Sequence, residues 1–164
     1  MPVTVPRPGT RGVPFPRLIP KLFGGLVLPM FRRRRGGHTQ GGVPAFVLET
    51  VGAKSGKLRH ALLGYLEDGP GAWLVVASLA GAARQPAWLY NLAHDPTATI
   101  EFGDGRRLRV EAETLQGPEL ERAWQRLERE APEYPKYHSK TDREIPVLRL
   151  RAVPEDGSAG SPAE

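Results

Sequence analysis

Most of the chain after Pro44 consists of short apolar runs separated by turn residues. Residues 68–71 (DGPG) and 103–105 (GDG) are turn sequences typical of links between adjacent strands. From residue 106 to 115 apolar and charged side chains alternate, which is the period of a strand with one solvated face. The pattern predicts six strands, at residues 46–50, 58–67, 72–78, 97–102, 106–115 and 145–150.

Two stretches carry helical signals. Residues 118–130 repeat apolar side chains at helical spacing after an acidic first turn. Residues 86–94 predict a shorter helix, because Pro86 suits a first turn and Asp95-Pro96 ends it. Residues 132–140 form a loop or a third short helix. Six mainly antiparallel strands with two to three flanking helices predict an α+β fold whose sheet curls into a split barrel, which leaves few exposed edges.

Charge is distributed unevenly along the 164 residues. Residues 1–35 carry eight basic residues and no acid, so the rest of the chain has a net charge near −3 although the total is +5. A mildly acidic body argues against a nucleic-acid module. The absence of cysteine excludes disulfides and thiolate chemistry.

Composition divides the chain into three parts: a mobile, basic, apolar-rich arm at residues 1–42, one folded domain at 43–151, and a disordered acidic tail at 152–164. The arm contains an apolar run that ends in four arginines, Arg32 to Arg35. Its longest uncharged run is ten residues, too short to span a bilayer. Two interpretations remain: residues 18–35 bind an anionic membrane surface, or they form a helix packed on their own domain.

The position of these four arginines also bears on where in the cell the protein is found. A secretory signal carries its charge ahead of the apolar run, whereas here four arginines follow it. The sequence therefore predicts a cytoplasmic protein, peripheral at the inner face of the cell membrane if the arm binds lipid.

The turn between the first two predicted strands concentrates hydrogen-bond donors. Lys54, Ser55, Lys57 and Arg59 lie within a few residues of two glycines that suit a tight turn. The spacing does not match a Walker phosphate loop. Such a turn is either a solvated basic hairpin or an anion site. The four histidines are scattered, without the spacing of metal ligands, and no metal is expected.

Four segments in order resemble the deazaflavin-dependent nitroreductase and quinone reductase family: residues 50–59 (TVGAKSGKLR), 75–78 (VVAS), 86–92 (PAWLYNL) and 134–147 (YPKYHSKTDREIPV). The resemblance implies a split barrel like that of FMN-binding proteins. It also implies the cofactor, coenzyme F420 (8-hydroxy-5-deazaflavin), and hydride transfer to quinones, nitroaromatics or similar acceptors. Split barrels of this kind often pair, so a homodimer is expected.

The resemblance assigns roles to individual positions. Lys54, Ser55 and Arg59, assisted by Lys57, would hold the cofactor's phosphate and oligoglutamate tail, and cations suit such an anion. The deazaflavin ring would contact a second set of residues: the side chains of Leu63 and Tyr65, backbone groups of Val76, Ala77 and Ser78, and the helix that carries Trp88 and Asn91.

Three residues would serve the acceptor. Tyr134 and Tyr137 would cover it, Ser78 would reach it, and one tyrosine hydroxyl would supply a proton. Simpler structural roles stay open, since Trp88 suits a core anchor and the two tyrosines suit loop packing.

The chain departs from the family at four positions. Ala53, Leu62, Leu79 and Ala80 stand where many relatives carry arginine, proline, lysine and glycine. Fewer cations weaken the expected grip on an anionic tail. Two alternatives therefore stay open: an FMN-dependent reductase with the same barrel, and a non-catalytic protein that binds a deazaflavin or another apolar ligand.

Overall fold

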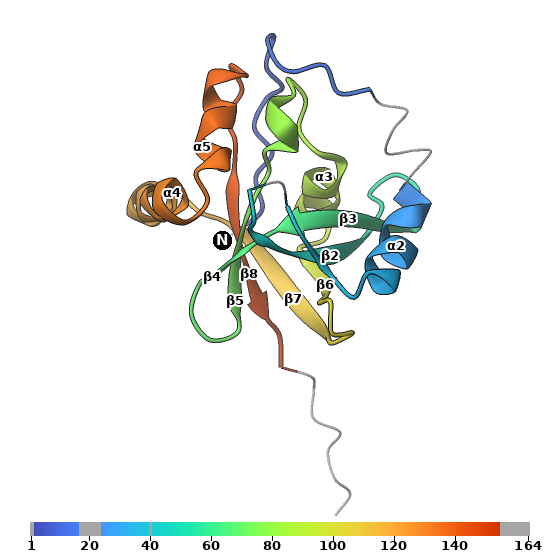
Figure 1. The fold of residues 1–164 in the computed structure, drawn as a ribbon. Coiled ribbons are helices and arrows are strands. Elements are labelled where there is room, and N and C mark those ends of the chain that lie inside the picture. The colour runs from blue at the N-terminus through green and yellow to red at the C-terminus, as the bar shows by residue number, and fades with distance from the viewer. Residues whose placement is uncertain (1, 17–23, 40, 155–164) are drawn as a thin grey trace, which may run out of the picture.

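The computed structural model describes residues 2–16, 24–39 and 41–154 (Figure 1). The described strands are β1 (Gly37–His38), β2 (Pro44–Val51), β3 (Leu58–Gly64), β4 (Leu66–Glu67), β5 (Ala72–Val76), β6 (Thr97–Glu101), β7 (Arg107–Thr114) and β8 (Val147–Ala152). The α-helices are α2 (Val27–Arg33), α3 (Ala87–His94), α4 (Gly117–Glu130) and α5 (Glu133–Lys136), and the 3-10 helices are η1 (Gly24–Leu26), η2 (Leu79–Gly81) and η3 (Tyr137–Ser139).

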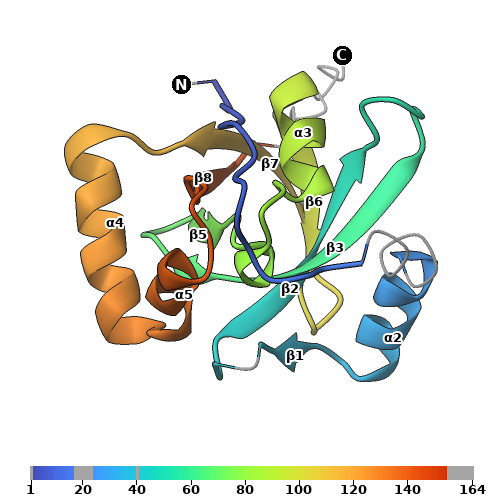
Figure 2. The same ribbon diagram turned by 90° about the horizontal axis from the view of Figure 1, so that it is seen from above.

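All strands belong to one antiparallel sheet in the order β1-β2-β6-β7-β8-β5-β4, with β3 paired to β2. The sheet is strongly curled into a half-barrel (Figures 1 and 2). The α+β, antiparallel prediction is confirmed. The predicted count of six strands is wrong, because the described residues contain eight.

One of the two extra strands, β4, arises because a predicted strand is broken. Predicted strand 58–67 divides at Tyr65: β3 pairs with β2, whereas Leu66 and Glu67 pair with β5. Gly64 lies at this division. The Tyr134 hydroxyl and the Thr39 side chain pack against it, in the space where a Cβ atom would lie. Such close approach requires a residue without a side chain.

Two apolar cores lie on opposite faces of the curled sheet. One face packs Phe46, Leu48, Val75, Leu148 and Leu150 against Leu89 and Leu92 of α3. The other packs Leu74, Val76 and Val147 against Ala123 and Leu127 of α4. Both predicted helices are therefore confirmed, and each buries its apolar stripe on one face.

The N-terminal residues 2–16 contain no helix or strand, yet they lie along the folded body (Figure 2). Backbone amides of Gly9 and Val13 donate to the carbonyl oxygens of Ala83 and Gly81 over 2.8 and 2.9 Å. The Asp142 carboxylate accepts further hydrogen bonds from this segment. A proline-rich composition gave no indication of these contacts.

The boundaries expected from composition also shift. Phe31 of α2 is buried and β1 pairs with β2, so both belong to the folded body rather than to a separate arm. Strand β8 runs to Ala152, beyond the predicted start of the tail. Residues 17–23, within the proposed membrane arm, and residues 155–164 of the proposed tail lie outside the described residues. No helix among the described residues is long and apolar enough to cross a membrane.

Candidate cofactor and acceptor site

The basic turn joins β2 to β3. The Gly52 amide donates to the Lys57 carbonyl oxygen and the Gly56 amide donates to the Gly52 carbonyl oxygen, both over 2.8 Å. Gly56 has the expected positive φ of 65°. Gly52 does not share it, and its role is close packing, because a Cβ there would lie 2.6 Å from Ser55 Oγ.

The side chains of this turn are available to an anion. Lys54, Lys57 and Arg59 are exposed, and none of them pairs with a carboxylate among the residues described. Arg59 Nη2 donates to Ser55 Oγ over 3.3 Å, which keeps the guanidinium beside the turn. Three cations and a hydroxyl on one tip are the donor set that phosphate and carboxylate groups require.

Helix α3 holds the turn in place through Asn91. The Ala53 amide donates to Asn91 Oδ1 and Asn91 Nδ2 donates to Thr50 Oγ1, both over 3.0 Å. Asn91 is buried, so this clamp is shielded from water. Trp88 on the same helix is also buried within the first core. The contacts of both residues with a cofactor stay predictions.

A row of side chains leads away from the basic turn along β3. Arg59 and Leu63 pair with Thr50 and Phe46 of β2, so they share the face that carries the first core. Tyr65 continues the row and stacks on Phe46 at 4.7 Å between ring centroids. Leu63 and Tyr65 remain partly exposed. Charge at one end and a flat, apolar surface at the other match the two parts of the predicted cofactor.

The end of β5 was predicted to bind the ring through its backbone. Val76 belongs to the β5–β8 ladder, and the Ala77 amide already donates to Pro146 O over 2.9 Å. The Ser78 amide has no hydrogen-bond partner among the described residues. Ser78 is therefore the member of this trio with a free backbone donor.

The rings of Tyr134 and Tyr137 lie 6.2 Å apart between centroids, and both pack against the second core. Near Gly81, three residues after Ser78, lie the Lys140 side chain and the backbone carbonyl oxygen of Tyr137. Tyr134 instead places its hydroxyl at Gly64. Burial raises the pKa of Tyr134 to about 12 and makes it a poor proton donor. The segment that carries Tyr137 therefore borders the Ser78 loop, and the role of either hydroxyl at the acceptor stays a prediction.

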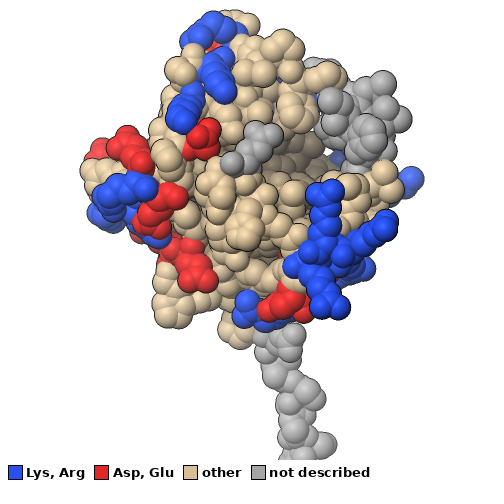
Figure 3. Space-filling model, in the orientation of Figure 1, with Lys and Arg blue, Asp and Glu red and all other residues tan. Residues whose placement is uncertain are grey.

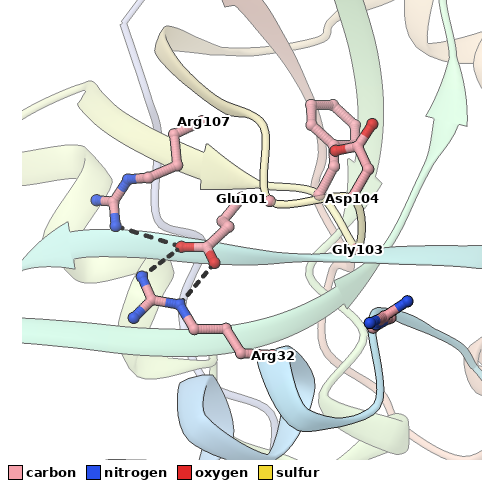
Figure 4. A pocket seen from close by; sticks show the side chains of 8 residues that line it. Arg32, Glu101, Gly103, Asp104 and Arg107 are labelled. Carbon is pink, nitrogen blue, oxygen red and sulfur yellow. Dashed lines mark hydrogen bonds and ion pairs between the residues drawn. The ribbon is translucent and has the colours of Figure 1, made fainter.

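A pocket of about 590 Å³ lies elsewhere, between α2 and the β6–β7 turn (Figure 4). Arg32 and Arg107 both point at Glu101, and Arg32 binds it through two hydrogen bonds of 2.7 and 2.9 Å. These guanidinium groups hold the pKa of Glu101 below its ordinary value. The pocket contains none of the predicted cofactor or acceptor residues, and no motif in the sequence indicated it.

The model of the F420H(2)-dependent quinone reductases matches residues 27–151, most of the chain. This chain belongs to that family. An F420H(2)-dependent quinone reductase of Mycobacterium tuberculosis H37Rv is 39% identical over 120 residues, which cover 71% of this chain and 79% of the relative. The solved structure of an F420-H2 dependent reductase has 37% identity and a TM-score of 0.59, covering 66% of this chain and 94% of its own.

A second solved relative is described as a domain-swapped dimer. It is 34% identical with a TM-score of 0.59, and the match covers 77% of this chain and 98% of that one. The predicted family is thus confirmed by both sequence and structure. The individual site residues stay predictions, supported by the geometry above.

Proposed function

We propose that this family member is an oxidoreductase that transfers a hydride from reduced coenzyme F420 to a quinone. One observation carries the proposal: the three cations of the β2–β3 turn lack carboxylate partners among the described residues, and they lead into the partly exposed Leu63–Tyr65 surface. An anionic tail and a flat ring would occupy these two regions. Nitroaromatic compounds are a second acceptor class of similar shape and electron demand.

The residues present fit the cofactor. Lys54, Ser55 and Arg59 would bind the phosphate and carboxylate groups of the tail, and Arg59 can offer two parallel donors to either. The bound deazaflavin supplies the hydride. The protein orients it: Leu63 and Tyr65 give an apolar surface for the ring and the Ser78 amide a free donor. The Tyr137 hydroxyl would provide the proton that the reduced acceptor takes up.

We also infer the assembly. The curled half-barrel would complete a split barrel of the FMN-binding kind, and a homodimer is supported by the relative described as a domain-swapped dimer. FMN would fit the ring surface, but its single phosphate would leave most of the cationic turn unused. Membership of the F420H(2)-dependent quinone reductase family also favours the deazaflavin over FMN.

The basic and apolar surface around α2 supports docking on an anionic membrane from the cytoplasmic side. Arg33, Arg34 and Arg35 are exposed, and cations gather over α2 in the space-filling view (Figure 3). Met30 of α2 and Leu62 of β3 are about half exposed nearby. Arg32 is engaged by Glu101, so three of the four arginines are available to lipid headgroups.

The decisive experiment mixes the protein with reduced F420 and menadione and follows cofactor reoxidation against a sample without enzyme. We expect enzyme-dependent reoxidation with the deazaflavin and none when reduced FMN replaces it. Turnover with FMN alone would support the alternative flavin reductase. Binding of F420, followed by fluorescence, without turnover of any quinone or nitro compound would indicate a carrier protein instead.

A further inference from the structure

The loop that follows Ser78 has an unusual backbone. Leu79 and Ala80 have φ angles of 40° and 52°, and Gly81 follows at 80°. This left-handed region is costly for a residue with a Cβ atom. Arg35 is the only other non-glycine residue there among those described. Specific contacts must therefore hold the loop in this shape.

A single guanidinium group contacts both ends of the loop. Arg143 Nη2 donates to the Ser78 carbonyl oxygen over 2.5 Å, and its Nε donates to the Ala82 carbonyl oxygen over 2.6 Å. Its Nη1 donates to Gln85 Oε1 over 2.9 Å. Arg143 and Gln85 are only 4% and 2% exposed. The planar fork of arginine spans the loop like a brace, which one lysine nitrogen could not do.

The partners of Arg143 distinguish it from an ordinary buried ion pair. Buried arginines usually face carboxylates, whereas among the described residues Arg143 binds only carbonyl and amide oxygens. Burial accordingly lowers its pKa. Four hydrogen bonds from the guanidinium to neutral oxygens serve geometry rather than charge neutralisation.

The N-terminal segment fixes the outer side of the same loop. Gly9 and Val13 donate their amides to Ala83 O and Gly81 O. The carbonyl oxygens of the loop are thus bound from two directions, by Arg143 and by residues 9–13. Ser78 at its start has little freedom to move.

We propose that Arg143 is a positioning residue for the acceptor site: it braces the left-handed loop that keeps Ser78 at the acceptor. The identity of the acceptor rests on the proposed function, while the brace itself rests on the contacts above. Ala80 makes this chain more dependent on the brace than glycine would, because glycine adopts a positive φ without strain.

The test compares full-length Arg143→Lys with the matched control Arg149→Lys. Arg149 is also largely buried, but it pairs with Asp68 and Glu113 instead of the Ser78 loop. The first readout is hydrogen exchange of the Gly81 and Ala82 amides, which donate within the loop. We expect exchange roughly 10-fold faster in Arg143→Lys and unchanged in the control.

The second readout is kinetic. In Arg143→Lys, kcat/KM for menadione should fall by about 10-fold while the F420 dissociation constant changes by less than about 3-fold, because the tail is held elsewhere. Adding Ala80→Gly to Arg143→Lys should recover part of both losses by removing the strain. The control should keep wild-type kinetics even if its thermal stability falls.

Each result has one meaning. Unchanged amide exchange in Arg143→Lys overturns the brace. Faster exchange with unchanged menadione kinetics overturns its role at the acceptor site. A wild-type protein without quinone turnover counts against the proposed function, and the exchange rates would still decide whether Arg143 holds the loop.

Discussion

At the scale of single residues, the two tyrosines that resemblance treats alike are both partly buried, and the pKa is raised at Tyr134. Tyr134 sits in the second core with its hydroxyl at Gly64, and its pKa is raised to about 12. Tyr137 packs against the same core at 6.2 Å from Tyr134 but also borders the Ser78 loop. A proton donor must reach the acceptor and give up its proton near neutral pH. The raised pKa makes Tyr134 the weaker candidate for this role.

We therefore predict that Tyr137→Phe lowers kcat for menadione by about 10-fold or more, since positioned proton donors contribute at least this much. Tyr134→Phe should leave kcat nearly unchanged and lower stability slightly, because it removes a buried hydroxyl. Stopped-flow reoxidation of F420 and thermal unfolding measure the two effects. Equal turnover in both variants and wild type would remove the tyrosines from proton transfer.

At the scale of elements, two long-range contacts hold two different parts of the structure in place. Asn91 of α3 holds the basic turn, and Glu101 of β6 holds α2 through Arg32. The first contact concerns ligand binding and the second concerns stability. Variants at the basic turn should therefore change ligand binding, and variants at the Arg32–Glu101 contact should change stability.

For the turn, we predict that Lys54→Ala with Arg59→Ala weakens F420 binding by about 10- to 100-fold, because each exposed charge contact contributes on the order of 1 kcal/mol. The variant should unfold at the same urea concentration as wild type, since neither side chain is buried. Fluorescence titration gives the affinity. Arg122→Ala with Arg129→Ala on α4, both exposed, serves as the charge-matched control, and wild-type affinity in the turn variant would refute the assignment of the tail site.

For α2, we predict that Glu101→Gln lowers the free energy of unfolding at pH 7 by about 1–2 kcal/mol, because two guanidinium groups lose their charged partner. The pKa of Glu101 is lowered in the folded protein. The stabilisation by ionised Glu101 is therefore fully present at pH values above the ordinary pKa of glutamate. It is lost as the pH falls through the lowered pKa of Glu101 in the folded protein.

Urea unfolding at several pH values tests this sign. The difference between wild type and Glu101→Gln should shrink as the pH approaches 3 or so, since protonated Glu101 and glutamine are both neutral. Glu111→Gln on β7, whose side chain is exposed, should show little difference at any pH. If the difference in unfolding free energy between wild type and Glu101→Gln stayed constant down to low pH, the substitution would have removed packing rather than a charge interaction.

At the scale of the whole molecule, Lys and Arg side chains gather over α2 on the face shown in Figure 3. We predict that Arg33→Glu with Arg34→Glu abolishes co-sedimentation with anionic liposomes at low salt, since each cation near such a surface contributes about 1 kcal/mol. Arg122→Glu with Arg129→Glu on α4 is the control of equal charge. Undiminished binding by the first variant would exclude α2 as the membrane contact.

Most strands, helix α4 and the basic turn were predictable, because each depends on neighbours within a few residues. Alternation, turn sequences and the helical stripe through Ala123 and Leu127 are local signals of this kind. The split of the second strand at Gly64 was not predictable, because Tyr134 and Thr39 arrive there from distant parts of the chain.

The sequence by itself determined the element types, the cationic turn and, through the ordered motifs, the family. Only the tertiary structure decided which groups act together: Asn91 with Ala53, Arg32 with Glu101, and Arg143 with Ser78. These pairs lie 38, 69 and 65 residues apart. A contact across such a separation leaves no periodic trace in the chain, since it forms only when packing of the whole sheet brings its two partners together.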